Sequence, residues 1–191
     1  MIKSTIRRCF STKAVERYLA QQSMNAMVFQ GVKRPPLWEK KPLPKIQEPT
    51  DVVVRVHKTT ICGTDLHILG GNVPKCEPGR VLGHEGIGHV VAKGDAVERF
   101  EVGDRVLASC ITACGKCVRC VRREHALCED GGWELGHTID GMQAEYARIR
   151  HADFTCHYLP DSVPQNSSLE DAYVMLSDIL PTGFEIGLRN G

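Results

Sequence analysis

The chain of 191 residues has few aromatic side chains, only 6% of the total, and no strong excess of charge of either sign. Lysine and arginine number 24 against 23 acidic residues, so the formal net charge of +1 creates no global field for nucleic acid or anionic membranes. No apolar run approaches the roughly 20 residues that a membrane-spanning helix needs. The sequence therefore predicts neither nucleic-acid nor membrane partners.

A second absence concerns dinucleotide binding. The G-x-G-x-x-G turn that joins strand and helix in a dinucleotide-binding βαβ unit occurs nowhere in this sequence. Gly70-Gly71 lies in a loop, and Gly131-Gly132 follows a cysteine-rich segment; neither pair separates a predicted strand from a predicted helix. These residues alone are therefore not expected to hold a nicotinamide cofactor.

Cysteine, by contrast, is abundant. The nine cysteines are Cys9, Cys62, Cys76, Cys110, Cys114, Cys117, Cys120, Cys128 and Cys156. Clustered cysteines indicate disulfides in a secreted chain and metal binding in a reducing compartment. The N-terminus lacks the continuous apolar core of a secretory signal, which favours metal.

The first 22 residues have a composition of their own. One acid, Glu16, stands among the basic residues Lys3, Arg7, Arg8, Lys13 and Arg17. Ile2, Ile6 and Phe10 are spaced four apart and would share one face of a helix. This pattern is typical of a mitochondrial transit peptide over residues 1–22, with a matrix-processing site that predicts cleavage after Phe10. The alternatives are a disordered or fortuitously basic start and a cytoplasmic protein.

The hydrophobic pattern predicts a mainly β fold. A proline-rich, extended segment covers residues 35–49. Strands are expected over residues 25–31, 52–60, 86–93, 105–109 and 143–149. Short strands separated by glycine turns are typical of a compact β barrel.

The period changes near the C-terminus. Ser167 and Glu170 have the spacing of a capping box and predict a helix over 169–177. Pro181 is expected to interrupt this helix, because proline lacks an amide donor and clashes with the preceding turn. A second helix is expected over 182–189.

The densest cysteine group lies within residues 110–130. Cys114, Cys117, Cys120 and Cys128 are separated by two, two and seven residues. Four thiolates form a closed tetrahedral zinc site without an open position for water, which is a structural site. An iron–sulfur cluster, free thiols and disulfides are the alternatives, and Cys110 could compete for a ligand position. Basic side chains between the cysteines would offset the negative charge: Lys116, Arg119, Arg122 and Arg123.

A second, dispersed set could form a catalytic metal site. Cys62, His84 and Asp178 would supply a thiolate, an imidazole and a carboxylate, and catalytic zinc needs three protein ligands with one position open. Each residue also has a structural explanation: a small buried cysteine, a hydrogen-bonded histidine and a charge at a helix end. Spacing alone leaves both interpretations open.

Several motifs carry a resemblance to a known family. Gly83-His84-Glu85-x-x-Gly88-x5-Gly94-x-x-Val97, with Gly103-Asp104-Arg105-Val106 after it, resembles the signature of zinc-containing alcohol dehydrogenases of the medium-chain family. Ile61-Cys-Gly-Thr-Asp-Leu-His67, the four-cysteine segment and Gly141-Met-Gln-Ala-Glu-Tyr146 follow in that family's order. The resemblance runs from about Asn25 to Gly191. It is greatest to the formaldehyde- or threonine-dehydrogenase-like branch, whose third zinc ligand is commonly aspartate, as at Asp178.

The resemblance implies a fold and its boundaries. It implies a GroES-like, partly open β barrel with short helices over residues 25–175, with the zinc lobe at 110–130. Residues 176–191 would begin the connection to a cofactor domain, and no Rossmann domain is expected within the 191 residues.

The resemblance also implies roles for individual residues. Two zinc ions are implied for each chain, a catalytic one held by Cys62, His84 and Asp178 and a structural one held by Cys114, Cys117, Cys120 and Cys128. Glu85 would approach the catalytic metal, and Asp65 would orient His84 by accepting its distal N–H. Thr64 would take the alcohol proton and His67 would pass it toward solvent through the cofactor ribose. Thr182 would contact the nicotinamide.

The implied activity is oxidation of a small alcohol to an aldehyde or ketone with NAD or NADP, by an enzyme that is a homo-oligomer at full length. The chain of 191 residues alone is expected to be inactive, since it lacks the cofactor site. A stand-alone zinc-binding or partner-binding module is the alternative function. Neither the particular alcohol nor the choice between NAD and NADP follows from these residues.

Overall fold

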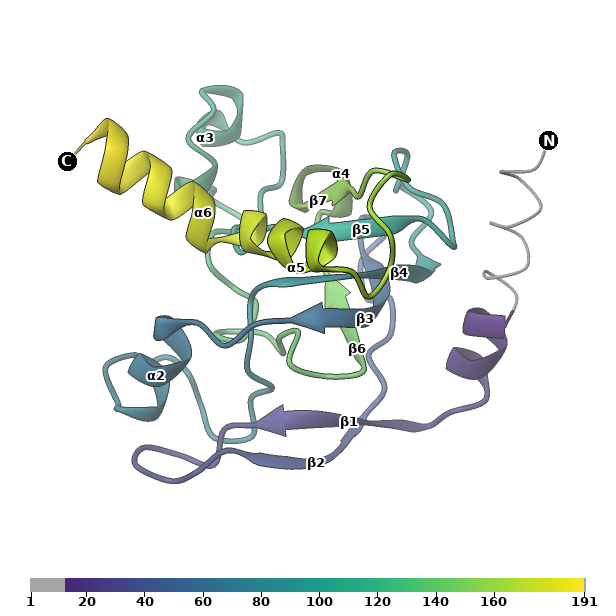
Figure 1. The fold of residues 1–191 in the computed structure, drawn as a ribbon, viewed down its shortest axis with the longest axis horizontal. Helices are drawn as coiled ribbons and strands as arrows, with labels where there is room; N and C mark the ends of the chain where they lie inside the picture. Colours follow the sequence, from purple (N-terminus) through teal and green to yellow (C-terminus); the bar gives the residue numbers. More distant parts are fainter. Residues whose placement is uncertain (1–12, 191) are drawn as a thin grey trace.

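The computed structural model describes residues 13–190, whose strands form two antiparallel sheets (Figure 1). The smaller sheet pairs β1 (Ser23–Val28) with β2 (Leu37–Pro42). The larger sheet has the order β6-β3-β4-β5-β7. Its strands are β3 (Val52–Thr59), β4 (Gly86–Lys93), β5 (Arg105–Ala108), β6 (Tyr146–Ile149) and β7 (Cys156–Tyr158).

The core lies on both faces of the larger sheet. Val52 and Val54 of β3 pack into one apolar cluster with Phe100 and Ile149, whereas Val53 points the other way, into a cluster with Met24 and other residues. This alternation follows from the two-residue period of a strand. Isolated β-bridges join β1 to Val81 and Ala144, and they hold the smaller sheet against the cluster that contains Met24. The result confirms the predicted mainly β architecture.

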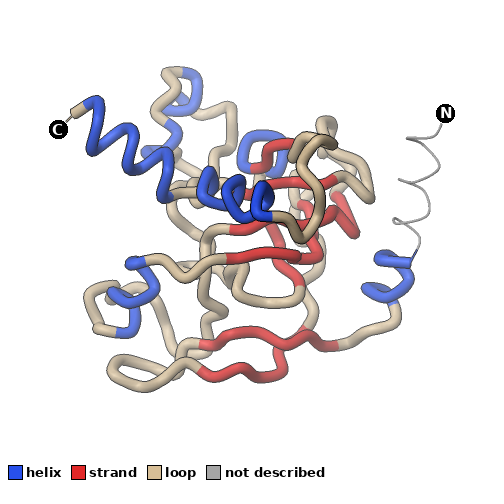
Figure 2. The backbone as a smooth tube through the Cα atoms, in the orientation of Figure 1, coloured by secondary structure: helices blue, strands red, loops and turns tan. Residues whose placement is uncertain are grey.

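The helices are short and lie at the periphery, where Figure 2 shows them around the strands. Beyond the helical residues near the N-terminus, the α-helices of the described chain are α2 (Gly63–Leu69), α3 (Val118–Val121), α4 (Ala152–Thr155), α5 (Ser168–Val174) and α6 (Ile179–Thr182). The chain also has two 3-10 turns, η1 (His125–Leu127) and η2 (Met175–Ser177), and a π-helical segment, η3 (Gly183–Arg189). Within residues 13–190 no helix is long and apolar enough to cross a membrane.

Residues 13–19 are helical and pack against the domain. Ala14 belongs to the apolar cluster that contains Met24, and the Tyr18 hydroxyl donates a hydrogen bond to the Pro44 carbonyl at 2.8 Å. Most of the predicted transit peptide, including its cleavage site after Phe10, lies outside the described residues. Cleavage at that position would leave the packed helix in the mature chain.

The predicted strands differ from the observed ones mainly at their ends. β1 stops at Val28, because Phe29 pairs with the loop at Arg80 and the chain then turns at Gly31, whose φ is +109°. β6 begins only at Tyr146, since the backbone of Gln143 is bonded to Leu82 instead. Two strands were not predicted. β2 lies in the proline-rich segment, where its proline is the last residue of an edge strand, and β7 has only three residues.

The capping box that was predicted for α5 is present in modified form. The Ser167 hydroxyl accepts a hydrogen bond from the Glu170 amide at 3.1 Å, as expected. The Glu170 carboxylate reaches back to the amide of Asn166 at 2.7 Å rather than to that of Ser167. Its other oxygen pairs with Arg105 at 2.7 Å, and the Glu170 side chain is fully buried. This residue therefore joins α5 to β5 as well as capping the helix.

The predicted interruption at Pro181 was wrong in position. The helical run breaks at Asp178, whose φ and ψ are −150° and −67°, and α6 starts directly after it. Pro181 lies in the first turn of α6, where amides have no partner within the helix and proline is tolerated. The second predicted helix accordingly begins at Ile179 rather than at residue 182.

Replacing the buried Glu170 is expected to destabilise the fold. In Glu170→Ala, Arg105 loses its carboxylate partner, so the free energy of unfolding should fall by about 3 kcal/mol. In the control Asp171→Ala, whose side chain is 61% exposed, the loss of the Lys58 pair should cost less than about 1 kcal/mol. Urea unfolding of the zinc-loaded chains measures both values. Similar small losses in the two variants would contradict this assignment.

Candidate functional site

The fold brings two groups of metal-binding side chains together. One group is Cys114, Cys117, Cys120 and Cys128, and the other is Cys62, His84, Glu85 and Asp178. In each group, one ligand atom from every residue lies within 4.8 Å of the others. These are the two predicted ligand sets, with Glu85 added to the second.

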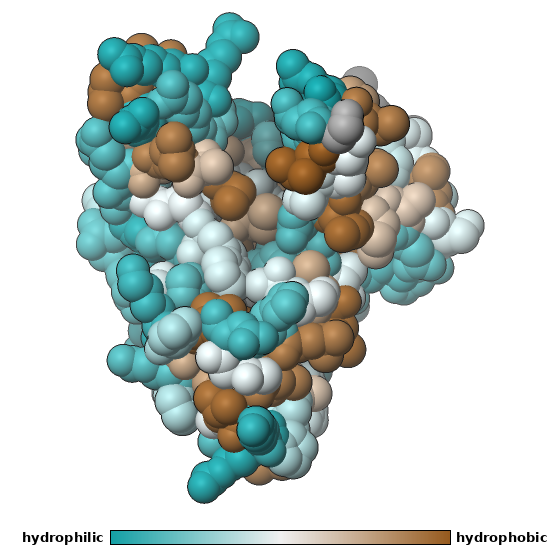
Figure 3. Space-filling view, turned by 90° about the vertical axis from the view of Figure 1, so that its left-hand side faces the viewer, coloured by the Kyte–Doolittle hydropathy of each residue, from teal (hydrophilic) through white to brown (hydrophobic). Residues whose placement is uncertain are grey.

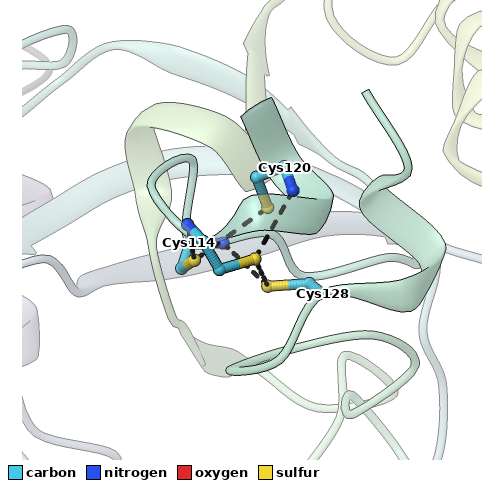
Figure 4. A group of neighbouring side chains, drawn as sticks. Cys114, Cys120 and Cys128 are labelled. Atoms are coloured by element: carbon cyan, nitrogen blue, oxygen red, sulfur yellow. Dashed lines mark hydrogen bonds between the residues drawn. The ribbon is translucent and has the colours of Figure 1, made fainter. Parts of the chain in front are cut away.

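The four-cysteine group is organised by backbone amides that point at sulfur (Figure 4). The amide of Cys117 donates to Cys114 Sγ at 3.4 Å, and the amide of Cys120 donates to Cys117 Sγ at 3.4 Å. The second of these bonds caps the N-terminus of α3. The amide of Cys114 donates to Cys128 Sγ at 3.3 Å, which closes the loop. Such bonds favour thiolates over thiols.

Glycine permits the tight turn inside this lobe. Gly115 has a φ of +74°, and a Cβ at this position would lie 2.1 Å from the ring of Phe154. A residue with a side chain would be strained there and would also push the ring away. The turn returns the chain from Cys114 toward Cys117 within two residues.

The electrostatics of the lobe fit a cation. Amide donors from Glu129 and Cys120 lower the pKa of the Cys117 thiol to about 6. Burial raises the pKa of the Cys120 thiol to about 12 and also raises that of Cys128. Four sulfur atoms so close together cannot all be ionised at neutral pH unless a positive ion offsets their mutual repulsion. The donor set is therefore that of a closed tetrathiolate site.

Cys110 does not belong to the four-sulfur group. Its amide donates to the Ser177 carbonyl at 3.0 Å, and its thiol is hydrogen-bonded to the Asp178 side chain. Burial, with the negative charge of Asp178 beside it, raises the pKa of this thiol to about 12. The alternative ligand that the spacing left open therefore lies beside the second group.

The second group is assembled from three distant segments. Cys62 precedes α2, and its amide is held by the Asp65 carboxylate at 2.9 Å. His84 and Glu85 precede β4 and follow Gly83, whose φ is +90°. Asp178 occupies the break between η2 and α6. Only the folded chain brings these three segments to one point.

Hydrogen bonds already link the ligand atoms of this group. His84 Nε2 lies 3.2 Å from Asp178 Oδ2, and Cys62 Sγ lies 3.9 Å from the same oxygen. Burial disfavours the charged imidazole, but the bonds to Asp178 and Cys62 outweigh it and raise the His84 pKa to about 9. The bond from His84 also lowers the pKa of Asp178. A positive charge is thus stabilised at the point where the three ligand atoms meet.

Glu85 completes this group from the side of α6. Its side chain is buried, and Oε1 accepts a hydrogen bond from the amide of Ile179 at 3.3 Å. Burial raises the pKa of the carboxyl group. The first residue of α6 is therefore tied to the start of β4.

The expected hydrogen bond between Asp65 and His84 is not formed. Asp65 Oδ2 accepts from the Cys62 amide and from Gln143 Nε2 at 3.1 Å. Asp65 Oδ1 and His84 Nδ1 are both buried and have no hydrogen-bond partner within residues 13–190. Unpaired buried polar atoms are costly. His84 Nδ1 is also the ring nitrogen not bonded to Asp178, the one that a metal-binding histidine uses to reach a supporting group.

The remaining predicted residues divide into two sets. Thr64 Oγ1 lies 3.7 Å from Cys62 Sγ, and Thr182 Oγ1 donates to Asp178 Oδ1 at 2.6 Å, so both adjoin the group. His67 is exposed in the last turn of α2, where its ring contacts Asn72. No bond between Thr64 and His67 is present in the described part of the chain. The proton relay and the nicotinamide contact remain predictions.

Sequence reasoning missed two neighbours of the second group. The ring of Trp133 meets that of His84 edge-on, with centroids 6.0 Å apart, and stacks on His137 at 4.2 Å. The buried Ser177 hydroxyl accepts a bond from the amide of Gly86 at 3.3 Å. Neither residue carries a recognisable local motif, because its role depends on contacts between segments that are far apart in sequence.

The chain is similar to several known proteins. It is 38% identical over 161 residues to a zinc-type alcohol dehydrogenase-like protein of Schizosaccharomyces pombe, covering 74% of this chain and 37% of the relative. It is 36% identical over 171 residues to the glutathione-independent formaldehyde dehydrogenase of Pseudomonas aeruginosa, covering 78% of this chain and 41% of the relative. The chain therefore spans less than half the length of these two curated relatives.

Solved structures agree with the sequence relatives. The apo form of zinc-dependent alcohol dehydrogenase 2 of Streptococcus pneumonia matches with a TM-score of 0.79 and 48% identity, over 88% of this chain and 46% of that one. The alcohol dehydrogenase of Thermus sp. ATN1 matches with a TM-score of 0.75 and 35% identity, over 84% of this chain and 46% of that one. Residues 48–161, more than half of the sequence, match the alcohol dehydrogenase GroES-like domain, and the chain belongs to that family.

Proposed function

We propose that this chain is the zinc-binding part of an NAD- or NADP-linked alcohol dehydrogenase, which oxidises a small alcohol to an aldehyde or ketone by hydride transfer. The observation that carries the proposal is the convergence of Cys62, His84, Glu85 and Asp178. A purely structural role would not require a thiolate, an imidazole and carboxylates to meet at one buried point. The relatives named as zinc-type and zinc-dependent alcohol dehydrogenases support the same activity.

Two zinc ions are proposed for each chain. Cys114, Cys117, Cys120 and Cys128 would hold the structural ion. Cys62, His84 and Asp178 would hold the catalytic ion, with one position left open for substrate. When bound there, zinc supplies Lewis acidity that lowers the pKa of the substrate alcohol, while NAD or NADP supplies the hydride acceptor.

The surrounding residues have defined tasks in this proposal. Thr64, beside Cys62, takes the proton of the alcohol, and the exposed His67 passes it toward solvent. Thr182 is oriented by Asp178 and contacts the nicotinamide. The edge of Trp133 packs against His84 and limits rotation of its ring.

The cofactor is proposed to bind to a domain outside these 191 residues. The sequence has no G-x-G-x-x-G turn, and the helices next to the second metal group expose apolar side chains. Five exposed residues of α6 and η3 are Ile179, Leu180, Phe184, Ile186 and Leu188. Figure 3 faces this side of the molecule and shows apolar patches around a hollow. Such a surface suits contact with another domain. From the family resemblance, and not from this surface, we infer that the complete enzyme is a homo-oligomer.

The same exposed surface favours one alternative, a zinc-containing module that binds a partner protein through α6 and η3. This function would need the four-cysteine site for stability and would not use Thr64. The alternative and the dehydrogenase proposal therefore differ in the consequence of changing Thr64.

A direct assay tests the proposed activity. A longer chain that continues into a dinucleotide-binding domain should reduce NAD or NADP with small primary alcohols, whereas the 191-residue chain should show no turnover. Thr64→Val in the longer chain should lower kcat/KM by about a hundredfold, the scale of one lost proton-transfer group. Cofactor reduction followed at 340 nm measures all three chains. Full activity in Thr64→Val, or no activity in the longer chain with any alcohol, would contradict the proposal.

Zinc content tests the structural site. The 191-residue chain should bind two zinc equivalents, and Cys120→Ala should retain one and lose the stability of its lobe. Cys110→Ala removes a neighbouring cysteine outside the four-sulfur group and should retain the lobe's zinc. Cobalt substitution distinguishes the two sites by the intensity of sulfur-to-cobalt charge-transfer absorption. The lobe has four thiolates and should absorb strongly, whereas the second site has one thiolate and should absorb weakly. Loss of this absorption in Cys110→Ala would show that the ligands of the lobe are wrongly assigned.

Mitochondrial import is proposed from the basic, hydroxyl-rich first 22 residues. A fusion of residues 1–22 to a fluorescent protein should reach the matrix and be shortened by about ten residues. Replacing Arg7 and Arg8 by glutamine should leave the fusion in the cytoplasm. Uniform cytoplasmic fluorescence of the unmodified fusion would contradict import and leave the enzymatic proposal unaffected.

A further inference from the structure

A cavity of about 590 Å³ lies beside β2 and β6, and none of the residues in either metal group lines it. Its volume falls within the range of small-molecule sites, roughly 300–1,000 Å³. The floor is apolar and buried, with Met24, Leu43 and Tyr146 each exposed by 9% or less. These residues belong to the apolar cluster between the two sheets, so the floor is a rigid part of the core.

Basic side chains surround the cavity. Lys41, Lys45, Arg80 and Arg148 all line it, and Asp140 is the one acidic residue among the described lining residues. Arg148 is neutralised by the buried Asp51 at 2.8 Å. Lys41 donates to the carbonyl of Gly79 at 2.8 Å and has no acidic partner within residues 13–190. The lining therefore carries an excess of positive charge.

Arg80 is only partly paired. Its Nη1 lies 3.5 Å from Asp140 Oδ1, at the limit of a hydrogen bond, and that oxygen also accepts the Val81 amide at 3.0 Å. The Nε–H of Arg80 is buried and has no partner in the described part of the chain. The hydroxyl of Tyr146, a further buried group of the lining, also makes no hydrogen bond there. The Arg80 side chain is 23% exposed and its one ion pair is long, so its Nη groups retain donor capacity for an oxygen of an anion in the cavity.

The geometry points to a binding site for an organic anion that has an apolar body and a single carboxylate or phosphate group. The apolar part would rest on Met24, Leu43 and Tyr146. The head group would meet Arg80 and the two lysines, since charge-assisted bonds are the strong ones at a partly exposed rim. The site is separate from the proposed dehydrogenase chemistry, because it contains neither a metal ligand nor a residue of the proton relay.

Calorimetric titration of the zinc-loaded chain tests the site. Octanoate and octyl phosphate are the two probes, and they distinguish a carboxylate ligand from a phosphate ligand. At least one should bind with saturation at one molecule per chain, more weakly as salt is raised. Octanol and octyltrimethylammonium, which share the apolar body but lack the negative charge, should bind at least tenfold more weakly.

Three variants locate the binding. Lys45→Gln changes an exposed lysine at the cavity, and Arg80→Gln removes the guanidinium; each should raise the dissociation constant at least fivefold. Lys40→Gln is the matched control, because Lys40 is also exposed, lies on β2 next to Lys41 and does not line the cavity. If Arg80→Gln fails to fold, the dissociation constant of Lys45→Gln alone tests whether the anion binds in this cavity. The inference is overturned if neither anion binds with saturation, if octanol binds as tightly, or if Lys45→Gln binds like Lys40→Gln.

Discussion

The position of the second metal group depends on a close approach of backbone segments where β4 begins. Gly88 pairs with Val56 of β3, and a Cβ at Gly88 would lie 2.2 Å from the carbonyl oxygen of the preceding residue, Arg55. A Cβ at Gly141 would lie 2.0 Å from the carbonyl oxygen of Gly83, so the backbone at residue 141 can approach that of Gly83 only because residue 141 is glycine. His84 follows Gly83 directly. The central strand of the larger sheet therefore determines where the imidazole lies, and the rest of the group is built around it.

The other ligands are brought to His84 by breaks in regular structure. Asp178 lies where η2 ends and α6 begins, and the Glu85 carboxylate accepts a hydrogen bond from the amide of Ile179, the first residue of α6. Cys62 lies immediately before α2, tied to Asp65. Ends of helices and strands are suitable places for such side chains. The backbone there is not held by the regular hydrogen bonds of the helix or sheet, while the adjacent helix or strand remains rigid. The same arrangement leaves the apolar face of α6 and η3 uncovered in the described residues.

Local features of this protein were predictable from sequence, and features that depend on distant contacts were not. The four-cysteine lobe followed from spacing alone, since Cys114 to Cys128 lie in one short segment. Cys62, His84 and Asp178 became a set only through the family resemblance. The roles of Trp133 and Cys110 arise from tertiary packing. Gln143, which is distant in sequence, holds Asp65 through Oδ2, and Asp65 Oδ1 makes no hydrogen bond to His84. β2 was missed because it lies in the proline-rich segment and contains a glutamate, two lysines and a proline, which are depleted in strands. Its pairing with β1 overrides this low strand propensity.

The central claim is that Cys62, His84 and Asp178 form a metal site distinct from the four-cysteine lobe. Crystals of the zinc-loaded protein, with diffraction measured on both sides of the zinc absorption edge, test this claim most directly. The account predicts two anomalous peaks, one enclosed by Cys114, Cys117, Cys120 and Cys128 and one between Cys62, His84 and Asp178. A single peak in the lobe, with the His84 and Asp178 side chains still hydrogen-bonded to each other, would contradict it.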